Sequence, residues 1–233
     1  IYLSPGRRSK YPNLVKNASF VIAGNEHLAN WASQHQANVH IVPTCVDTTR
    51  YQQKSDYALP ARPEVGWVGL SSNLPYVSSI TQELREPLAS HQARLHILSS
   101  RPGKLELPTL FTPWSMAVET SVIEQFDVGL MPLPDTDFAR GKCGLKILQY
   151  MAAGVPVIAS AVGINRTIIE HGVNGLLVET PGQWSEALHT LLGDTERRAS
   201  MGRAGRRTVE TQYSTETWGP KLVKLYQELA SSL

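Results

Sequence analysis

Two basic residues stand directly before a glycine that opens a short helix. Arg140 and Lys142 precede Gly144, and apolar residues after Gly144 recur at helical spacing. The first backbone N–H groups of a helix lack partners within it, so those of Cys143, Gly144 and Leu145 point into this basic mouth. The helix dipole and two cations favour an anion there, usually phosphate. The sequence therefore predicts a phosphate site, although a basic loop ahead of an ordinary helix has the same pattern.

The segment 141–160 supplies the elements that would position this site. Its apolar spacing predicts a helix with one buried face, formed by Leu145, Leu148, Met151 and Ala152. Gly154 occupies the position of a left-handed C-terminal cap, and Pro156 prevents the helix from continuing. The apolar residues 155–158 then predict a short strand that is buried on both faces.

Residues 126–179 resemble the donor-binding core of the retaining GT-B glycosyltransferases, the group 1 family. The family signature has Glu, Gly-Phe-Gly, a short helix, a second Glu and Ala-Met-Ala-x-Gly-x-Pro-Val. The residues in register are Gly144, Met151, Ala152, Gly154, Pro156 and Val157, and downstream Gly163, Asn165, Arg166, Ile169, Glu170, Gly172, Asn174 and Gly175. Gly141 and Gln149 stand where the family has its two Glu residues. The subgroup with Arg-Gly-Lys-Cys before the helix commonly lacks the first Glu, so its loss does not imply inactivity.

The resemblance implies a UDP- or GDP-linked sugar as donor substrate, and neither a metal nor another cofactor. The helix N-terminus, Lys142 and Arg140 would hold the diphosphate. We expect Arg140 and Lys142 to be catalytic, because they would stabilise the charge that accumulates on the departing nucleotide. Gln149 lies five residues after Gly144, an axial rise of about 7 Å, which is about the reach from a diphosphate to its ribose.

Two further segments are expected at the donor site. Ser71, Ser72 and Asn73 follow a strand at the first βα turn of a parallel sheet, where nucleotide phosphates are usually held. The same three residues also suit a plain helix cap. Trp114 falls in the loop that supplies the family's nucleobase pocket, where its ring would stack on the base or simply pack. We interpret the Asp135–Asp137 segment beside the same mouth as a turn.

The alternation of strands and helices across 65–192 predicts an α/β fold with a Rossmann-like, doubly wound parallel sheet. By resemblance, 65–212 is the nucleotide-sugar (donor) binding domain, 48–64 the linker, and 213–233 the helix that crosses back to the first domain. Residues 1–47 contain a β-α-β unit that resembles the end of the acceptor domain. Such a unit needs more strands beside it to bury both faces. We therefore expect that much of the first domain is absent from this chain.

The composition excludes several other classes. The 22 basic and 20 acidic residues give a formal charge of +2, too balanced for a nucleic-acid binder. Cys45 and Cys143 lack metal-ligand spacing and indicate free thiols in a reducing compartment. Since no run of about 20 apolar residues is present, we expect a cytoplasmic protein. The basic segment 196–212 predicts one solvated helix face, or a peripheral membrane contact, formed by Arg197, Arg198, Arg203, Arg206 and Arg207.

We favour a retaining glycosyltransferase of polysaccharide or glycoconjugate assembly, with a carbohydrate or lipid-linked acceptor. The alternative is a non-catalytic module that binds a nucleotide or nucleotide sugar, which the departures at Gly141 and Gln149 favour. An epimerase of the same fold would need carboxylates around the sugar, and Gly141 speaks against that. Fold-level similarity does not separate these classes. Because the acceptor pocket would come from residues outside this chain, we expect donor binding without appreciable transfer.

Overall fold

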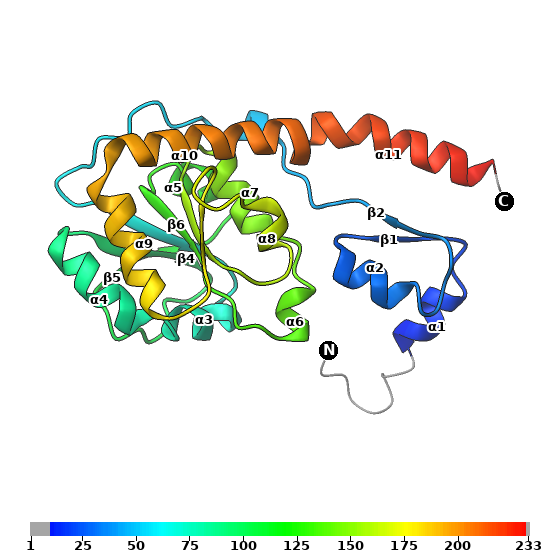
Figure 1. The fold of residues 1–233 in the computed structure, drawn as a ribbon, viewed down its shortest axis with the longest axis horizontal. Helices are drawn as coiled ribbons and strands as arrows, with labels where there is room; N and C mark the ends of the chain where they lie inside the picture. Colours follow the sequence, from blue (N-terminus) through cyan, green and yellow to red (C-terminus); the bar gives the residue numbers. More distant parts are fainter. Residues whose placement is uncertain (1–9, 232–233) are drawn as a thin grey trace.

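The computed structural model describes residues 10–231, which form two α/β units joined by a linker and a long C-terminal helix (Figure 1). The outermost residues of the predicted segments 1–47 and 213–233 lie outside this range. The smaller unit comes first and contains α1 (Lys10–Lys16), β1 (Val21–Ala23), α2 (Glu26–Ala32) and β2 (Val39–Ile41). A turn of 3₁₀-helix, η2 (Thr48–Arg50), opens the linker to the larger unit.

The larger unit is built on a six-stranded parallel sheet with the order β5-β4-β3-β6-β7-β8. Its strands are β3 (Glu64–Val68), β4 (Arg94–Ser99), β5 (Thr109–Pro113), β6 (Val128–Met131), β7 (Val157–Ser160) and β8 (Leu176–Val178). The chain starts with β3 in the middle, adds β4 and β5 on one side, and returns to add the others beyond β3. The order thus reverses between β3 and β6, and open sheets of this kind bind ligands at the carboxyl ends of the strands there.

Helices cover both faces of this sheet. One face packs against α3 (Leu74–Ser78), α4 (Thr81–Ser90) and α9 (Gly182–Gly193). The other packs against α5 (Glu119–Ile123), α7 (Leu145–Ala152) and a π-helical turn, η4 (Val209–Tyr213). Strands β3, β6 and β7 are buried along their whole length, which explains their nearly continuous apolar sequences. The predicted doubly wound α/β sheet is confirmed.

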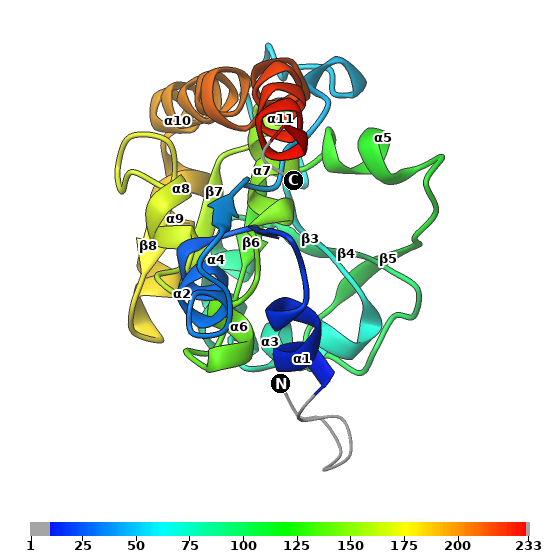
Figure 2. The same cartoon turned by 90° about the vertical axis from the view of Figure 1, so that its right-hand side faces the viewer.

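The smaller unit pairs β1 with β2 in parallel, and most of their residues are only half-buried or exposed. The C-terminal helix α11 (Thr215–Ala230) extends away from the larger unit over this one (Figures 1 and 2). There Tyr226 meets Phe20 edge to face, with ring centroids 5.8 Å apart. Val46 exchanges backbone hydrogen bonds of 2.9 and 3.1 Å with Tyr213 and Thr215 at the start of α11. That this unit belongs to a larger acceptor domain stays a prediction.

Several short helices lie in the connections between the strands. After β3, a 3₁₀ turn, η3 (Ser71–Asn73), is followed by the separate helices α3 and α4. Between α3 and α4, the Ser79 hydroxyl donates to the Tyr76 carbonyl and the Thr81 hydroxyl donates to the Ser78 carbonyl. Such bonds from side chain to backbone compete with the helical hydrogen bonds. The turn after β6 contains α6 (Asp137–Arg140), capped by the Thr136 hydroxyl. A further short helix, α8 (Asn165–Ile168), follows β7.

The prediction that the arginines of 196–212 share one solvated face is wrong. Arg198, on α10 (Thr195–Thr208), is only 1% exposed. Its guanidinium donates to two carbonyls in the last turn of α9 and to the Tyr57 carbonyl in the linker, at 2.6–3.1 Å. Arg206 likewise donates to the last carbonyl of α7, that of Ala152. The last carbonyls of a helix lack partners within it, and a guanidinium can satisfy several at once.

Arg197, Arg203 and Arg207 do remain exposed on α10. A contact between these three residues and a membrane surface stays a prediction. Within residues 10–231, every helix is too short or too polar to cross a bilayer.

Replacing Arg198 should destabilise the larger unit strongly. Arg198→Ala removes the donor for three buried carbonyls and leaves a cavity, so we expect a loss of about 3 kcal/mol in the free energy of unfolding. The measurement is urea unfolding followed by circular dichroism. The exposed neighbour Arg197→Ala is the control and should change stability by less than about 0.5 kcal/mol. Equal losses in the two variants would contradict the role given to Arg198.

Candidate functional site

A cavity of about 400 Å³ lies at the carboxyl ends of the strands where the sheet order reverses. It is bordered by the residues after β3, by Met131 of β6, and by the first turn of α7. Most of the predicted donor-site residues line it: Asn73, Trp114, Lys142, Cys143, Gly144, Leu145 and Gln149. The fold therefore brings together segments that are up to 80 residues apart in the chain, at the place where this class of sheet binds ligands.

The start of α7 has the backbone geometry that the sequence predicts. Gly144, the N-cap residue, has φ = 72°, and a Cβ there would collide with the Ile168 side chain. Gly154 ends the helix with φ = 72°, in the left-handed conformation expected of it. In the described part of the chain, the N–H groups of Cys143, Gly144 and Leu145 donate to no other residue. They are available to an anion in the cavity.

Tyr150 holds α7 at this position in the sheet. Its ring is fully buried, and its hydroxyl accepts a hydrogen bond from the Val68 N–H at 3.0 Å and donates to the Leu130 carbonyl at 3.3 Å. These two residues belong to β3 and β6, the strands on either side of the reversal. Gly129 of β6 permits the close approach, because a Cβ there would lie 2.6 Å from the Tyr150 ring. The start of α7 is thus fixed over the strand ends.

Two lysines line the cavity beside the free N–H groups. The Nζ atom of Lys142 lies 4.8 Å from the ring centroid of Phe138, and that of Lys146 lies 5.6 Å from the centroid of Trp67. Burial lowers the pKa of Lys142. Burial, and secondarily the charge of Lys142, lowers the pKa of Lys146 to about 8. Within residues 10–231 neither lysine forms an ion pair with a carboxylate.

Lys146 is a site residue that the sequence analysis missed. It lies among the apolar residues of the predicted helix, and the sequence analysis assigned it no role. One signal could have identified it, because a lysine in the first turn of a helix opposes the helix dipole unless an anion is bound there. The position of Lys146 also explains why residue 69 is a glycine, because a Cβ there would lie 2.7 Å from the Lys146 Cε.

The predicted base and ribose contacts lie on the same cavity. The Trp114 ring is 46% exposed, and its indole N–H donates to the Glu119 carboxylate at 2.8 Å. Gln149 is nearly buried, and its amide nitrogen donates to the Tyr51 hydroxyl at 3.2 Å. The carbonyl oxygen and the second N–H of the Gln149 amide therefore remain available to a ligand hydroxyl. Tyr51, in the linker, is a supporting residue that the sequence analysis did not identify.

The serines of the first βα turn stand apart from the cavity. Ser71 and Ser72 do not line it, and Ser71 accepts a hydrogen bond from Ser100 at 3.1 Å. The alternative of a plain cap also lacks support, since no side-chain hydrogen bond caps η3 or α3. Of these three residues, Asn73 alone borders the cavity. A role of Ser71 and Ser72 in donor binding stays a prediction.

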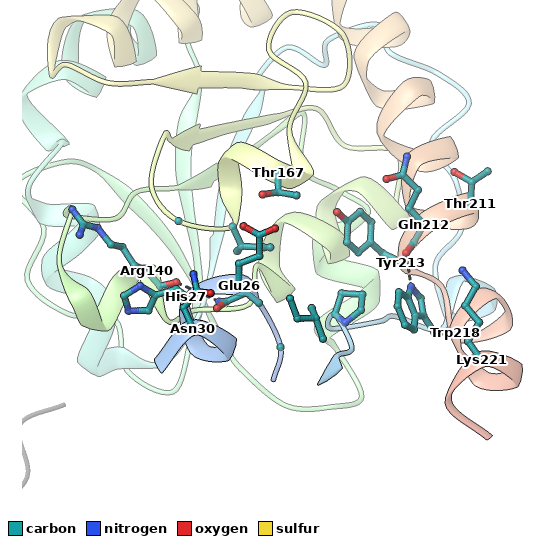
Figure 3. A pocket seen from close by; sticks show the side chains of 16 residues that line it. Glu26, His27, Asn30, Arg140, Thr167, Thr211, Gln212, Tyr213, Trp218 and Lys221 are labelled. Atoms are coloured by element: carbon teal, nitrogen blue, oxygen red, sulfur yellow. Dashed lines mark hydrogen bonds between the residues drawn. The ribbon is translucent and has the colours of Figure 1, made fainter. Parts of the chain in front are cut away.

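Arg140 lies on a different cavity from Lys142. This second cavity, of about 630 Å³, lies between the two units, where Figure 3 shows Arg140 near His27 and Asn30 of α2. The Arg140 guanidinium forms two hydrogen bonds, of 2.6 and 2.9 Å, with the Asp135 carboxylate. This pairing lowers the pKa of Asp135 and raises that of Arg140. In the structure, Lys146 rather than Arg140 accompanies Lys142 at the start of α7.

No three His, Cys, Asp or Glu side chains within residues 10–231 are grouped so that they could bind a metal ion. The two cysteines are free thiols. Burial raises the pKa of both. Anion binding is the chemistry that the lined cavity supports.

Residues 62–194 match the protein family described as "Glycosyl transferases group 1". The chain belongs to this family. The matched segment contains the whole six-stranded sheet and both lysines of the cavity. The resemblance found in the sequence is thereby confirmed.

Two curated relatives of this chain differ in how much of it they match. The spore coat protein SA of Bacillus subtilis is 35% identical over 83 residues, 34% of this chain and 22% of the relative. The D-inositol 3-phosphate glycosyltransferase of Corynebacterium jeikeium is 24% identical over 259 residues, 96% of this chain and 60% of the relative. The chain thus spans between about a fifth and three fifths of the length of these relatives.

Solved structures share the fold of this chain. Sucrose-phosphate synthase from Thermosynechococcus elongatus superposes with a TM-score of 0.78 at 21% identity, over 100% of this chain and 63% of that structure. Anabaena HepE, solved in complex with UDP and glucose, superposes with a TM-score of 0.77 at 18% identity, over 97% and 68%. The fold is therefore of the GT-B type, and the roles of individual site residues stay predictions.

Lys146→Met should raise the free energy of unfolding at pH 7. The folded-state pKa is about 8 against an ordinary 10.5, so the cost of burying the ammonium is fully present below pH 8. This cost disappears as the pH rises from about 8 to about 10.5, because the unfolded state then binds more protons. We expect a gain of about 2 kcal/mol at pH 7 and little gain at pH 10.5.

Urea unfolding at the two pH values measures this difference. The control is Lys104→Met, which removes an exposed lysine from a loop. If the two variants gained the same stability at each pH, the low pKa assigned to Lys146 would be wrong.

Proposed function

We propose that this group 1 glycosyl transferase chain binds the nucleoside diphosphate of a sugar donor in the 400 Å³ cavity. The observation that carries the proposal is the meeting of Lys142, Lys146 and the free N–H groups of α7 where no carboxylate pairs with either lysine. Two partly buried cations beside a positive helix end repel one another. A diphosphate would relieve that repulsion and form charge-assisted hydrogen bonds with all three groups.

The same groups fit a transfer reaction as well as binding. When the bond between sugar and phosphate breaks, the departing nucleoside diphosphate gains negative charge. Interactions that strengthen as this charge develops lower the barrier, because they favour the transition state over the bound donor. Lys142 and Lys146 would supply this stabilisation in a retaining transfer to a carbohydrate or lipid-linked acceptor in polysaccharide or glycoconjugate assembly.

The remaining parts of the cavity fit a nucleoside. The exposed Trp114 ring offers a stacking surface for a base, and its hydrogen bond to Glu119 fixes the ring plane. Gln149 lies one and a half turns along α7, where its free amide oxygen can accept from a ribose hydroxyl. HepE, similar in fold, was solved in complex with UDP-glucose, so UDP is the first nucleotide to test.

The second candidate function is a module that binds the donor without transferring the sugar. It is favoured by Gly141, which replaces the first signature Glu and offers no side chain to the sugar. A Cβ at Gly141 would lie in van der Waals contact with the Leu28 side chain of α2, 3.4 Å away. An assay of sugar transfer separates the two functions once donor binding is established.

Lys142→Ala should weaken binding of UDP at least tenfold, about 1.4 kcal/mol. The reason is the loss of a cation that faces the diphosphate in a partly desolvated cavity. Isothermal titration calorimetry with UDP, GDP and ADP first identifies the preferred base, and the variant is then titrated with that nucleotide. Arg140→Ala is the comparison, and we expect less than a twofold change because Arg140 pairs with Asp135 on the other cavity. Absence of heat with all three nucleotides would contradict the proposed function.

The affinity for UDP should fall as the pH rises above about 8. In the free protein the Lys146 ammonium loses its proton near this pH, whereas the bound diphosphate stabilises the protonated form. We expect nearly constant affinity from pH 7 to 8 and a fall of up to tenfold per pH unit above it. Titrations between pH 7 and 9.5 measure the profile. Lys146→Met should bind more weakly and with a flatter profile, and an unchanged profile would exclude Lys146 from the phosphate site.

A further inference from the structure

Asn25 of the smaller unit is bonded to the loop that carries Lys142. The side chain is buried, with 3% exposure, although it lies at the boundary of the two units. Its amide nitrogen donates to the Lys142 carbonyl at 3.0 Å and to the Arg140 carbonyl at 3.3 Å. Its amide oxygen accepts from the Leu28 N–H at 2.9 Å and thereby caps α2. Both ends of the amide are therefore used, one within its own unit and one across the boundary.

These hydrogen bonds fix the direction of a peptide group at the donor cavity. The chain contains no cis peptide bond among its described residues, and in a trans peptide the C=O and N–H point in opposite directions. Because the Lys142 carbonyl points at Asn25, the N–H of the same peptide, that of Cys143, points away from Asn25. Cys143 borders the donor cavity, and its N–H is one of the groups without a protein acceptor.

The boundary around this contact is closely packed. A Cβ at Gly24, the residue before Asn25, would lie 2.5 Å from the Cys143 sulfur, so the absence of a side chain there permits the contact. On the far side of the loop, Figure 3 shows His27 and Asn30 of α2 near Arg140. The loop is thus bounded by the smaller unit at both of its ends, and a shift of that unit would move the loop.

We propose that Asn25 is a positioning residue for the phosphate site. Its amide group orients the Lys142–Cys143 peptide, so that the strength of diphosphate binding depends on the docking of the smaller unit against the larger one. The inference rests on the proposed function and adds a form of regulation to it. Movement between the units would be transmitted to the donor's phosphates through this side chain.

The test is the variant Asn25→Ser. Serine still caps α2 but cannot reach the two carbonyls of the loop, so the fold of the smaller unit is kept and the contact is lost. We expect UDP to bind about fivefold to tenfold more weakly, which corresponds to the loss of one or two hydrogen bonds. Binding of uridine, which lacks the phosphates, should change less than twofold. A merely structural role would weaken both ligands alike.

The matched control is Asn30→Ser, the same change on an exposed residue of α2. It should leave the affinity for UDP within twofold of the wild-type value. Equal effects of the two variants, or equal losses of UDP and uridine binding in Asn25→Ser, would overturn the proposal.

Hydrogen exchange separates failure of this inference from failure of the proposed function. In Asn25→Ser the peptide covering residues 138–146 should exchange faster than in the wild type, without nucleotide present. If the wild type binds no UDP, the proposed function is wrong, but the role of Asn25 is judged separately from hydrogen exchange. Unchanged exchange in Asn25→Ser would overturn that role. Faster exchange would show that Asn25 orients this loop.

Discussion

The positive N-terminus of α7 and the side chains of Lys142 and Lys146 share one partly buried cavity, where these positive charges repel one another. This repulsion is the constraint on which the rest of the structure depends. A helix with cations at its N-terminus is destabilised. The burial of α7 offsets this destabilisation, because its residues Ile147, Leu148, Tyr150 and Met151 are fully enclosed. Core packing therefore holds in place a charge arrangement that is unfavourable until an anion binds.

The sheet determines where that arrangement lies. The 400 Å³ cavity lies at the strand ends where the sheet order reverses between β3 and β6, and α7 reaches it because Gly129 admits the Tyr150 ring. The linker, distant in sequence from α7, also supports the site, because the Tyr51 hydroxyl accepts a hydrogen bond from the Gln149 amide at 3.2 Å. The segment that matches the group 1 glycosyl transferases, residues 62–194, contains this edge of the sheet.

The two units are joined at several places, and these contacts would respond differently to a movement of one unit relative to the other. At one end, Val46 bonds to the backbone of Tyr213 and Thr215, where η4 passes into α11. At the other, Asn25 contacts the loop before α7. A backbone connection near the helix can act as a pivot, whereas the Asn25 side chain contacts Lys142, which lines the candidate donor cavity. This difference is why we assign the coupling to Asn25 and not to the helix crossing.

The sequence by itself determined the features that depend on local backbone geometry and on periodicity. Gly144, Gly154 and Pro156 specify where α7 starts and stops, because left-handed φ angles favour glycine and proline cannot continue a helix. Apolar runs specified the parallel sheet. The position of Lys142 before α7, the spacing of Gln149 from Gly144 and, for Trp114, the resemblance to the family predicted a shared site, and all three residues line one cavity. What only the tertiary structure decided is which charged groups face a ligand and which face the protein. Arg198 was predicted on a solvated face and Lys146 was assigned no role, yet Lys146 lines the cavity and Arg198 is enclosed by carbonyls. Arg140, two residues from Lys142, pairs with Asp135 on the opposite side of the loop. A charged side chain has many rotamers and no periodic signal, so its partner is set by contacts between segments distant in sequence.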